Sequence, residues 1–181
     1  MIGLKNIASL ISTLPALIKG AKFGKNSYIA PGYDFLFVKL RGLQVGDDVL
    51  IGRRAWVQTI ESGQILIGDG TQIGRDAMIS SVGVISIGKK CMFSYRTSLL
   101  DHDHNFNHKD VLASGLTTPQ EIIIGDGCFI GAQSFILKGV QLGERCIVGA
   151  NSVVTKSFPA DTIIGGNPAI KIGVRTYTSV E

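Results

Sequence analysis

Residues 99–110, LLDHDHNFNHKD, contain all three histidines of the chain, His102, His104 and His108. Three imidazoles in so short a stretch could bind a metal ion, or provide one general base beside two bystanders. They could also belong to a polar loop without chemistry. The elements that position this stretch decide among the three interpretations.

The 181-residue chain is long enough for one domain with an apolar core. Charged residues make up 18% and hydrophobic residues 45%, and 23 glycines spread along the chain indicate many turns. The net charge of +4 is modest. Because the basic residues are scattered and no array of stacking aromatics is present, we expect no nucleic-acid partner.

The N-terminal residues 1–22 are apolar but are interrupted by Lys5 and Pro15. The longest uncharged run, 6–18, is too short to span a bilayer, and the features of a signal peptide are missing. We therefore expect an amphipathic helix that covers one end of the core. Peripheral contact of residues 1–20 with a membrane is the alternative.

A six-residue period dominates the chain from about Phe23 to Val154. Position one is a branched aliphatic residue, position two is mostly glycine and position five is small, as in VGDDVL, IGRRAW, IGDGTQ, IGRDAM, IGKKCM, IGDGCF, IGAQSF, LGERCI and VGANSV. This period fits neither a helix nor a hairpin sheet. It predicts a short strand and a turn of about 120°, repeated so that three hexads form one triangular coil with position one inside.

The pattern also predicts where each coil begins. The expected starts are Phe23, Val45, Ile67, Ile87, Ile124 and Leu142. The spacing is longest between Ile87 and Ile124, because an insertion follows Leu99. That insertion contains the histidines.

All three cysteines, Cys91, Cys128 and Cys146, fall on position five of a hexad. A thiol there is expected to act as a small buried side chain. An odd number of thiols at one repeat position argues against both a disulfide framework and a nucleophile. Reduced cysteines, together with the missing export signal, favour the cytoplasm.

The hexads and the closing IIGGNPAIKIG at 163–173 resemble those of the hexapeptide-repeat acyltransferases over residues 23–173. The chain is most similar to the maltose/galactoside acetyltransferase branch, which includes bacterial O-acetyltransferases acting on lipopolysaccharide and capsule sugars. The resemblance implies an all-β, left-handed parallel β-helix at 23–173 with an inserted loop at about 101–121. A helical cap at 1–22 and a tail at 174–181 complete the expected organisation.

The same resemblance implies an acetyl-CoA-dependent O-acetyltransferase. It would move an acetyl group to a hydroxyl of a sugar or polysaccharide precursor by direct attack, without a covalent enzyme intermediate. It also implies a homotrimer whose active site lies between two subunits.

Register within the family selects His104 as the general base, because the catalytic histidine lies five residues after the leading aliphatic of LLDHDH. A neutral imidazole is a suitable base for a sugar hydroxyl near pH 7. Its second nitrogen needs an acceptor, for which Asp101, Asp103 or a backbone carbonyl could serve. His102 and Asp101 then have orienting or secondary roles, and Asn105 is a candidate polar partner.

Relatives often carry an asparagine near the acceptor, on the coil beneath the histidine. This chain has Gly74 in that slot, with Arg75 and Asp76 beside it. These three residues are candidates for acceptor binding, and Asn105 or Asp76 could substitute for the missing asparagine. Phe129 matches a position where relatives place an aromatic side chain at the acceptor cleft.

For the donor, the resemblance implies that coenzyme A lies along the later coils. Ala132 and Ala150 match small residues beside the pantetheine arm. Lys156 matches a lysine that meets the phosphates of the cofactor, as a point charge would. Lys171 and Arg175 are further basic candidates, although they do not fall on the usual positions.

Three other functions are compatible with this type of repeat. A γ-type carbonic anhydrase would bind zinc through three histidines, but its ligands come from separate coils and two subunits, so we expect no metal here. A purely structural β-helix would need no histidine at the catalytic slot. An N-acetyltransferase acting on a nucleotide-linked amino sugar is the runner-up among enzymes.

Overall fold

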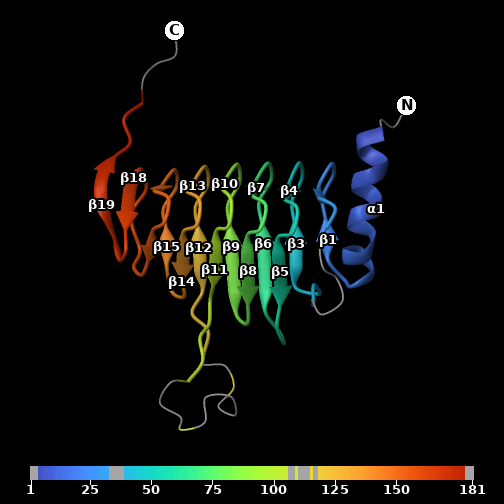
Figure 1. Ribbon diagram of the computed structural model, residues 1–181, viewed down its shortest axis with the longest axis horizontal. Helices are drawn as coiled ribbons and strands as arrows, with labels where there is room; N and C mark the ends of the chain where they lie inside the picture. The colour runs from blue at the N-terminus through green and yellow to red at the C-terminus, as the bar shows by residue number, and fades with distance from the viewer. Residues whose placement is uncertain (1–3, 33–38, 106–108, 110–114, 116–117, 178–181) are drawn as a thin grey trace.

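The computed structural model describes residues 4–32, 39–105, 109, 115 and 118–177. Figure 1 shows one elongated solenoid with helix α1 (Leu4–Ile18) at one end and the C-terminal strands at the other. No helix in the described part of the chain combines the length and apolarity needed to cross a membrane.

Three sheets run along the solenoid, and the strands of each coil pair with those of the coils before and after it. The first sheet consists of β1 (Lys22–Phe23), β3 (Leu43–Val45), β6 (Gln64–Ile67), β9 (Val84–Ile87), β12 (Ile122–Ile124) and β15 (Gln141–Leu142). The second consists of β2 (Tyr28–Ile29), β4 (Leu50–Ile51), β7 (Gln72–Ile73), β10 (Met92–Phe93), β13 (Phe129–Ile130), β16 (Ile147–Val148), β18 (Thr162–Gly166) and β19 (Ala169–Val174). The third consists of β5 (Trp56–Thr59), β8 (Met78–Ser81), β11 (Ser98–Leu100), β14 (Phe135–Leu137) and β17 (Val153–Val154). Neighbouring strands are parallel, except for the antiparallel pair β18–β19 that ends the solenoid.

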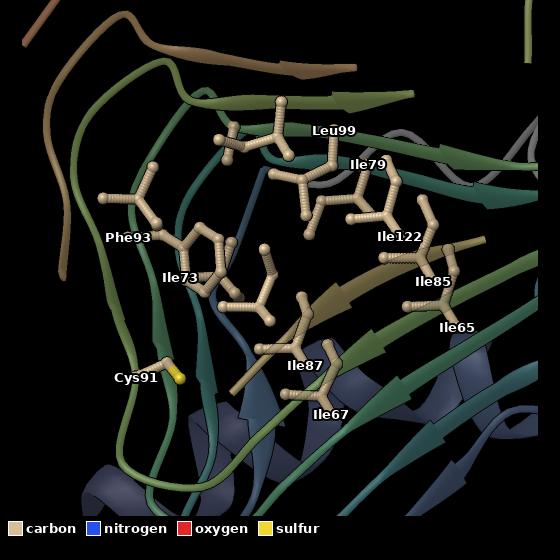
Figure 2. Close-up of a cluster of buried hydrophobic side chains, with 14 of the residues drawn as sticks. Ile65, Ile67, Ile73, Ile79, Ile85, Ile87, Cys91, Phe93, Leu99 and Ile122 are labelled. Atoms are coloured by element: carbon tan, nitrogen blue, oxygen red, sulfur yellow. The ribbon is translucent and has the colours of Figure 1, made fainter. Parts of the chain in front are cut away.

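The aliphatic residues predicted to start each coil stack directly on one another. Val45 pairs with Ile67, and Ile67 pairs with Ile87. Across the insertion, Ile87 still pairs with Ile124. These side chains are buried, and Figure 2 shows Ile67 and Ile87 side by side in the cluster of apolar side chains. The predicted period and the predicted coil starts are therefore confirmed.

Small residues at position five form hydrogen bonds between coils. The thiol of Cys128 donates to the Gly143 carbonyl oxygen at 3.2 Å. The hydroxyl of Ser134 donates to the Gly149 carbonyl oxygen at 2.9 Å. The other thiols make the same kind of contact, Cys91 with Gly125 and Cys146 with Pro159. All three cysteines are free and buried, so each thiol fills a corner and satisfies a carbonyl of the next coil.

Helix α1 covers the first coil through its small and polar face. Thr13 and Ala16 are buried, and the backbone N–H of Ile29 donates to Thr13 Oγ1 at 3.1 Å. The opposite face exposes Ile11 and Ile18. The helix thus seals one end of the core and presents an apolar surface outward.

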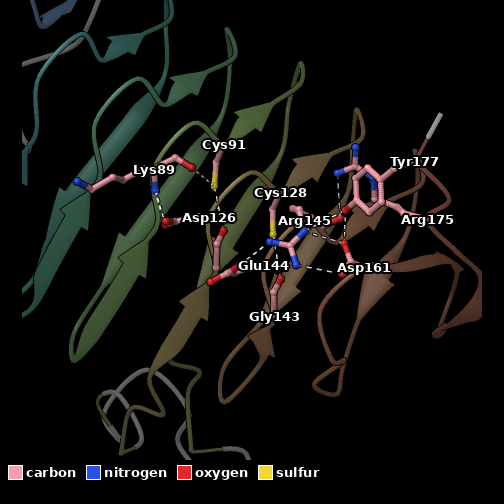
Figure 3. A network of polar contacts seen from close by, with 11 residues as sticks. Lys89, Cys91, Asp126, Cys128, Gly143, Glu144, Arg145, Asp161, Arg175 and Tyr177 are labelled. Atoms are coloured by element: carbon pink, nitrogen blue, oxygen red, sulfur yellow. Dashed lines mark hydrogen bonds and ion pairs between the residues drawn. The ribbon is translucent and has the colours of Figure 1, made fainter. Parts of the chain in front are cut away.

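A polar network ties the C-terminal segment to the last coils (Figure 3). Arg145 donates from Nε and Nη2 to the Asp161 carboxylate at 2.8 and 3.0 Å. The hydroxyl of Tyr177 donates to the same carboxylate. Arg175 donates from Nη1 to the Arg145 carbonyl oxygen at 3.3 Å. The hydrogen bonds from Arg145, followed by that from Tyr177, lower the pKa of Asp161 to about 2.

The close packing at Cys128 predicts a graded response to substitution. Cys128→Ser should change the free energy of unfolding by about 1 kcal/mol or less, because a hydroxyl can keep the bond to the Gly143 carbonyl. Cys128→Leu should lower it by about 1–3 kcal/mol, because the corner has no room for extra methylenes. Urea unfolding at fixed protein concentration measures both. A leucine variant as stable as the serine variant would show that the corner is not closely packed.

The low pKa of Asp161 predicts a pH-dependent stabilisation. Because the folded pKa lies below the unfolded value of about 3.9, the ionised carboxylate stabilises the fold above that pH. The contribution is lost as the pH falls towards the folded value of about 2. Asp161→Asn should therefore lower the Tm at pH 7, and the difference from wild type should shrink between about pH 4 and pH 2. Tyr177→Phe, which keeps the ion pair with Arg145, should lower the Tm less. A difference independent of pH would assign Asp161 a packing role only.

Candidate active site

The histidine segment leaves the solenoid at the corner between the third sheet and the first. Strand β11 ends at Leu100 and β12 begins at Ile122, and Figure 1 shows the chain leaving the sheets after β11 and returning before β12. The two ends of the insertion are joined, because the Gln120 N–H donates to the Asp101 carbonyl oxygen at 2.9 Å. Its base is therefore fixed to the solenoid. His108 lies outside the described residues.

The carboxylate of Asp101 anchors this base. Its side chain is fully buried and accepts three hydrogen bonds from the preceding coil. The donors are the Ser81 hydroxyl at 2.7 Å and the backbone N–H groups of Val82 at 2.9 Å and Gly83 at 3.0 Å. A buried carboxylate is tolerated when its lone pairs are satisfied in this way.

The fourth group on this carboxylate is the imidazole of His102, whose Nδ1 lies 2.9 Å from Asp101 Oδ1. The His102 side chain is only 9% exposed. Because an ionised carboxylate can only accept, Nδ1 carries a proton and Nε2 presents a lone pair in the neutral ring. Asp101 is one of the acceptors that the sequence left open for the ring of His104. In the structure its carboxylate binds the ring of His102 instead. The described residues place no carboxylate on the ring of His104.

His104 and Asn105 follow at the start of the insertion, and both are exposed. Asp103, the second candidate for orienting an imidazole, instead forms an ion pair with Lys138 Nζ at 2.7 Å. Lys138 follows β14, on the coil that succeeds the insertion. The chain thus anchors the residues that precede His104 and leaves its imidazole exposed.

The acceptor candidates lie at a different corner, between the second and the third sheet. A Cβ on Gly74 would come within 2.5 Å of the Ser94 carbonyl oxygen of the next coil, which excludes a side chain in this slot. Asp76 accepts two hydrogen bonds from Arg54, at 2.6 and 2.9 Å. The guanidinium of Arg75 lies over a neighbouring aromatic ring. Within one chain, these residues do not meet His102 or His104.

The same corner contains arginines that the sequence reasoning missed. Arg53 and Arg54 precede Arg75 by one coil, and Arg96 follows it by one coil. The available signal was the alignment of IGRRAW, IGRDAM and FSYRTS, which places these residues at positions three and four of equivalent hexads.

Two of the donor candidates continue this corner along the later coils. Ala132 follows β13 and Ala150 follows β16, and the Asn151 N–H donates to the Ala132 carbonyl oxygen at 2.9 Å. Phe129 points outward from β13 with 38% exposure, in register with the exposed Met92. The small side chains leave the backbone of this corner open beside an apolar face.

The basic donor candidates are separated from one another. Lys156 is exposed after β17, and its Nζ lies 5.8 Å from the ring centroid of Phe158. Lys171 is exposed on β19. Arg175 is engaged with the C-terminal network, so its guanidinium already has partners.

The described residues contain no group of three histidine, cysteine or carboxylate side chains arranged to hold a metal ion. His102 is oriented by a carboxylate, and His104 is exposed beside it in the chain. The three-histidine metal interpretation includes His108, which is outside the described residues.

Comparison with known proteins gives a consistent result. The family described as "Hexapeptide repeat of succinyl-transferase" matches residues 121–156. The Escherichia coli protein named for colanic acid biosynthesis as the acetyltransferase WcaF is 34% identical over 143 residues, covering 78% of this chain and 74% of the relative.

Solved structures show the same architecture. An N-acyltransferase from Bacillus cereus, AntD, in complex with dTDP and coenzyme A superimposes with a TM-score of 0.73. It covers 96% of this chain and 88% of its own, at 23% identity. A hexapeptide-repeat acetyltransferase from Vibrio cholerae, complexed with acetyl coenzyme A, gives a TM-score of 0.59 at 28% identity over 71% of each chain. The predicted left-handed parallel β-helix is confirmed, and by its repeat, its fold and its relatives the chain belongs to the hexapeptide-repeat acyltransferase family of enzymes.

Proposed function

We propose that the protein is an acetyl-CoA-dependent O-acetyltransferase that modifies a hydroxyl of a sugar or polysaccharide precursor. The observation that carries the proposal is the histidine segment at the anchored base of the insertion, in the register that the family uses for its catalytic base. The relative named for colanic acid biosynthesis supports a glycan acceptor. The Vibrio cholerae structure with acetyl coenzyme A supports the donor.

In the proposed reaction, His104 is the general base. Its neutral imidazole takes the proton of the sugar hydroxyl as the oxygen attacks the thioester carbonyl carbon. The tetrahedral intermediate collapses, the carbon–sulfur bond breaks, and the imidazolium returns the proton to the thiolate of coenzyme A. No cysteine takes part. This agrees with the burial of all three thiols in the corners of the solenoid.

His102 and Asp101 serve as positioning residues in this scheme. Three donors from the preceding coil hold the Asp101 carboxylate, and this carboxylate holds the His102 ring. Because Asp101 and His102 are held in place, the backbone that leads to His104 starts from a fixed position. This fixes where the imidazole of His104 can reach.

The placement of the candidate residues supports a site shared between copies of the chain. His102 and His104 lie at the corner between the third and first sheets, whereas Gly74 and Ala150 lie at the corner between the second and third. Two corners of one filled coil cannot face each other, but a corner of one copy can face another corner of its neighbour. We therefore propose a homotrimer with the acetyl donor and the base on different subunits.

N-acetylation of a nucleotide-linked amino sugar is the second candidate. The Bacillus cereus N-acyltransferase with bound dTDP has the same fold, and the fold alone does not separate an amine from a hydroxyl acceptor. An acceptor panel of sugars, nucleotide sugars and lipid-linked glycans, read by thiol release and product mass, distinguishes the two. An acetylated amine as the product formed with the highest kcat/KM would favour the second candidate.

The proposed location is the cytoplasm, with peripheral membrane contact through residues 1–20. Three cysteines without a disulfide support a reducing compartment. The exposed face of α1, with Ile11, Leu14 and Ile18 at helical spacing, supports contact with a lipid surface.

The scheme predicts unequal effects of the histidines. His104→Ala should lower kcat by roughly 10²–10⁴, the usual contribution of a positioned base, with little change in the affinity for acetyl-CoA. His102→Ala should cost less, and His108→Ala less again. Because the role of His102 is positional, His102→Gln should recover part of the loss while leaving the pH profile of kcat unchanged.

A chelator titration is the control for the histidine variants, and it should leave activity unchanged. Equal damage from all three alanine variants, with loss of activity on chelation, would instead indicate a metal site. A larger loss at His102 than at His104, with an altered pH profile, would transfer the role of base to His102.

The shared site predicts complementation between inactive variants. His104→Ala removes the base, and Ala150→Trp should block the donor side. In trimers assembled from an equal mixture of the two, roughly a quarter of the sites should combine an intact histidine with an intact donor corner, and activity should return in proportion. Each variant alone, assembled in the same way, is the control. Mixed trimers without activity would place the whole site in one chain.

A further inference from the structure

Four exposed arginines occupy one corner of three consecutive coils. This arginine corner, between the second and third sheets, consists of Arg53, Arg54, Arg75 and Arg96. The Arg96 N–H donates to the Arg75 carbonyl oxygen at 3.1 Å, and the Asp76 N–H donates to that of Arg53 at 3.0 Å. These backbone hydrogen bonds join successive coils, so the arginines are stacked at the spacing of neighbouring strands, about 4.8 Å.

The positive charge of the arginine corner is not balanced. Asp76 is the one acidic side chain among the described residues of this corner, and it is bound by Arg54 through two hydrogen bonds. Arg75 reaches the same carboxylate at 3.5 Å. The hydrogen bond from Arg54 is the main cause of the lowered pKa of Asp76, and the charges of Arg75 and Arg96 add to it. One carboxylate thus serves several guanidinium groups, and a net positive field remains.

An aromatic ring holds two of the guanidinium groups in place. The guanidinium carbons of Arg75 and Arg96 lie 5.1 and 4.9 Å from the ring centroid of Tyr95. Stacking on a ring restricts the guanidinium group while leaving its N–H donors free for oxygen ligands. Like charges on adjacent coils repel, so the arrangement is best satisfied by an anion with several oxygens.

The arginine corner adjoins the proposed donor site along the same edge. The Gln133 N–H, next to Ala132, donates to the Tyr95 carbonyl oxygen at 2.9 Å. The arginines therefore lie on the earlier coils, and the small residues of the proposed donor site lie on the later coils of the same corner. The two sets of coils are directly adjacent. An acceptor held by the arginines would approach the donor from the N-terminal side.

We propose that the arginine corner binds the diphosphate of the acetyl acceptor, and that the acceptor is a sugar carried on a diphosphate rather than a neutral free sugar. The inference rests on the proposed function. Guanidinium groups match phosphate oxygens in pairs, and two adjacent phosphates can engage arginines of two neighbouring coils. Nucleoside diphosphates and lipid diphosphates share this chemistry.

Calorimetric titration with inorganic pyrophosphate tests the site. The protein is saturated with coenzyme A, so that the phosphate groups of the donor are already bound. Arg53→Gln/Arg96→Gln should weaken pyrophosphate binding by about tenfold or more, because charge-assisted contacts are lost. The matched control, Lys25→Gln/Lys90→Gln, removes the same charge from exposed residues at the corner between the first and second sheets, and it should bind like wild type.

Several results would overturn the proposal. These are a wild type that does not bind pyrophosphate, an equal loss in both double variants, or a loss of coenzyme A affinity in the arginine variant. Titrations with uridine diphosphate and with farnesyl diphosphate then distinguish the two sources by which binds more tightly. If pyrophosphate binds as expected but no sugar in the panel is acetylated, the assignment to an acetyl acceptor fails and the diphosphate site stands.

Discussion

Neighbouring coils lie one strand spacing apart, about 4.8 Å, and the rest of the structure depends on this separation. Each residue is stacked on its equivalent in the next coil, so the side chain at a position must pack against the side chains at the same position in the coils above and below. Where position two is glycine, as at Gly52, a side chain has no space, because a Cβ there would come within 2.7 Å of the Arg75 backbone nitrogen. At position five a small group fits and donates to the next coil, as Cys128 does.

The same stacking determines how charge is arranged on the surface. Opposite charges at equivalent corner positions form ion pairs between coils, as Lys89 does with Asp69 and Arg145 with Asp161. The arginine corner differs, because residues of the same charge repeat there on successive coils. The fold supplies one carboxylate, that of Asp76, for the several guanidinium groups of this column, so a bound anion can supply the missing negative charge. A departure from the stabilising pattern is therefore informative about binding.

The sequence was sufficient to predict the elements governed by the period. Each coil start, such as Ile87 and Ile124, could be located because its burial depends only on the repeat. The partner of Asp101 could not be predicted, because Ser81 and Gly83 lie on a bulged corner where the six-residue count is interrupted. The sequence also could not predict that Arg175 binds within the C-terminal network, because this contact depends on the path of the chain after β19.

Because side chains fill the interior of the solenoid, a reaction can take place only on its outer surface. The interior aliphatic residues are buried along its whole described length, so a substrate can only lie against a sheet or a corner. One convex corner cannot enclose a reacting thioester and exclude water, and a second wall is required. The insertion is anchored through Asp101 to a rigid coil, which gives its first residues a defined position relative to the prism. In the proposed trimer, the packing of two rigid solenoids against each other would set the distance between the proposed base and the acetyl donor.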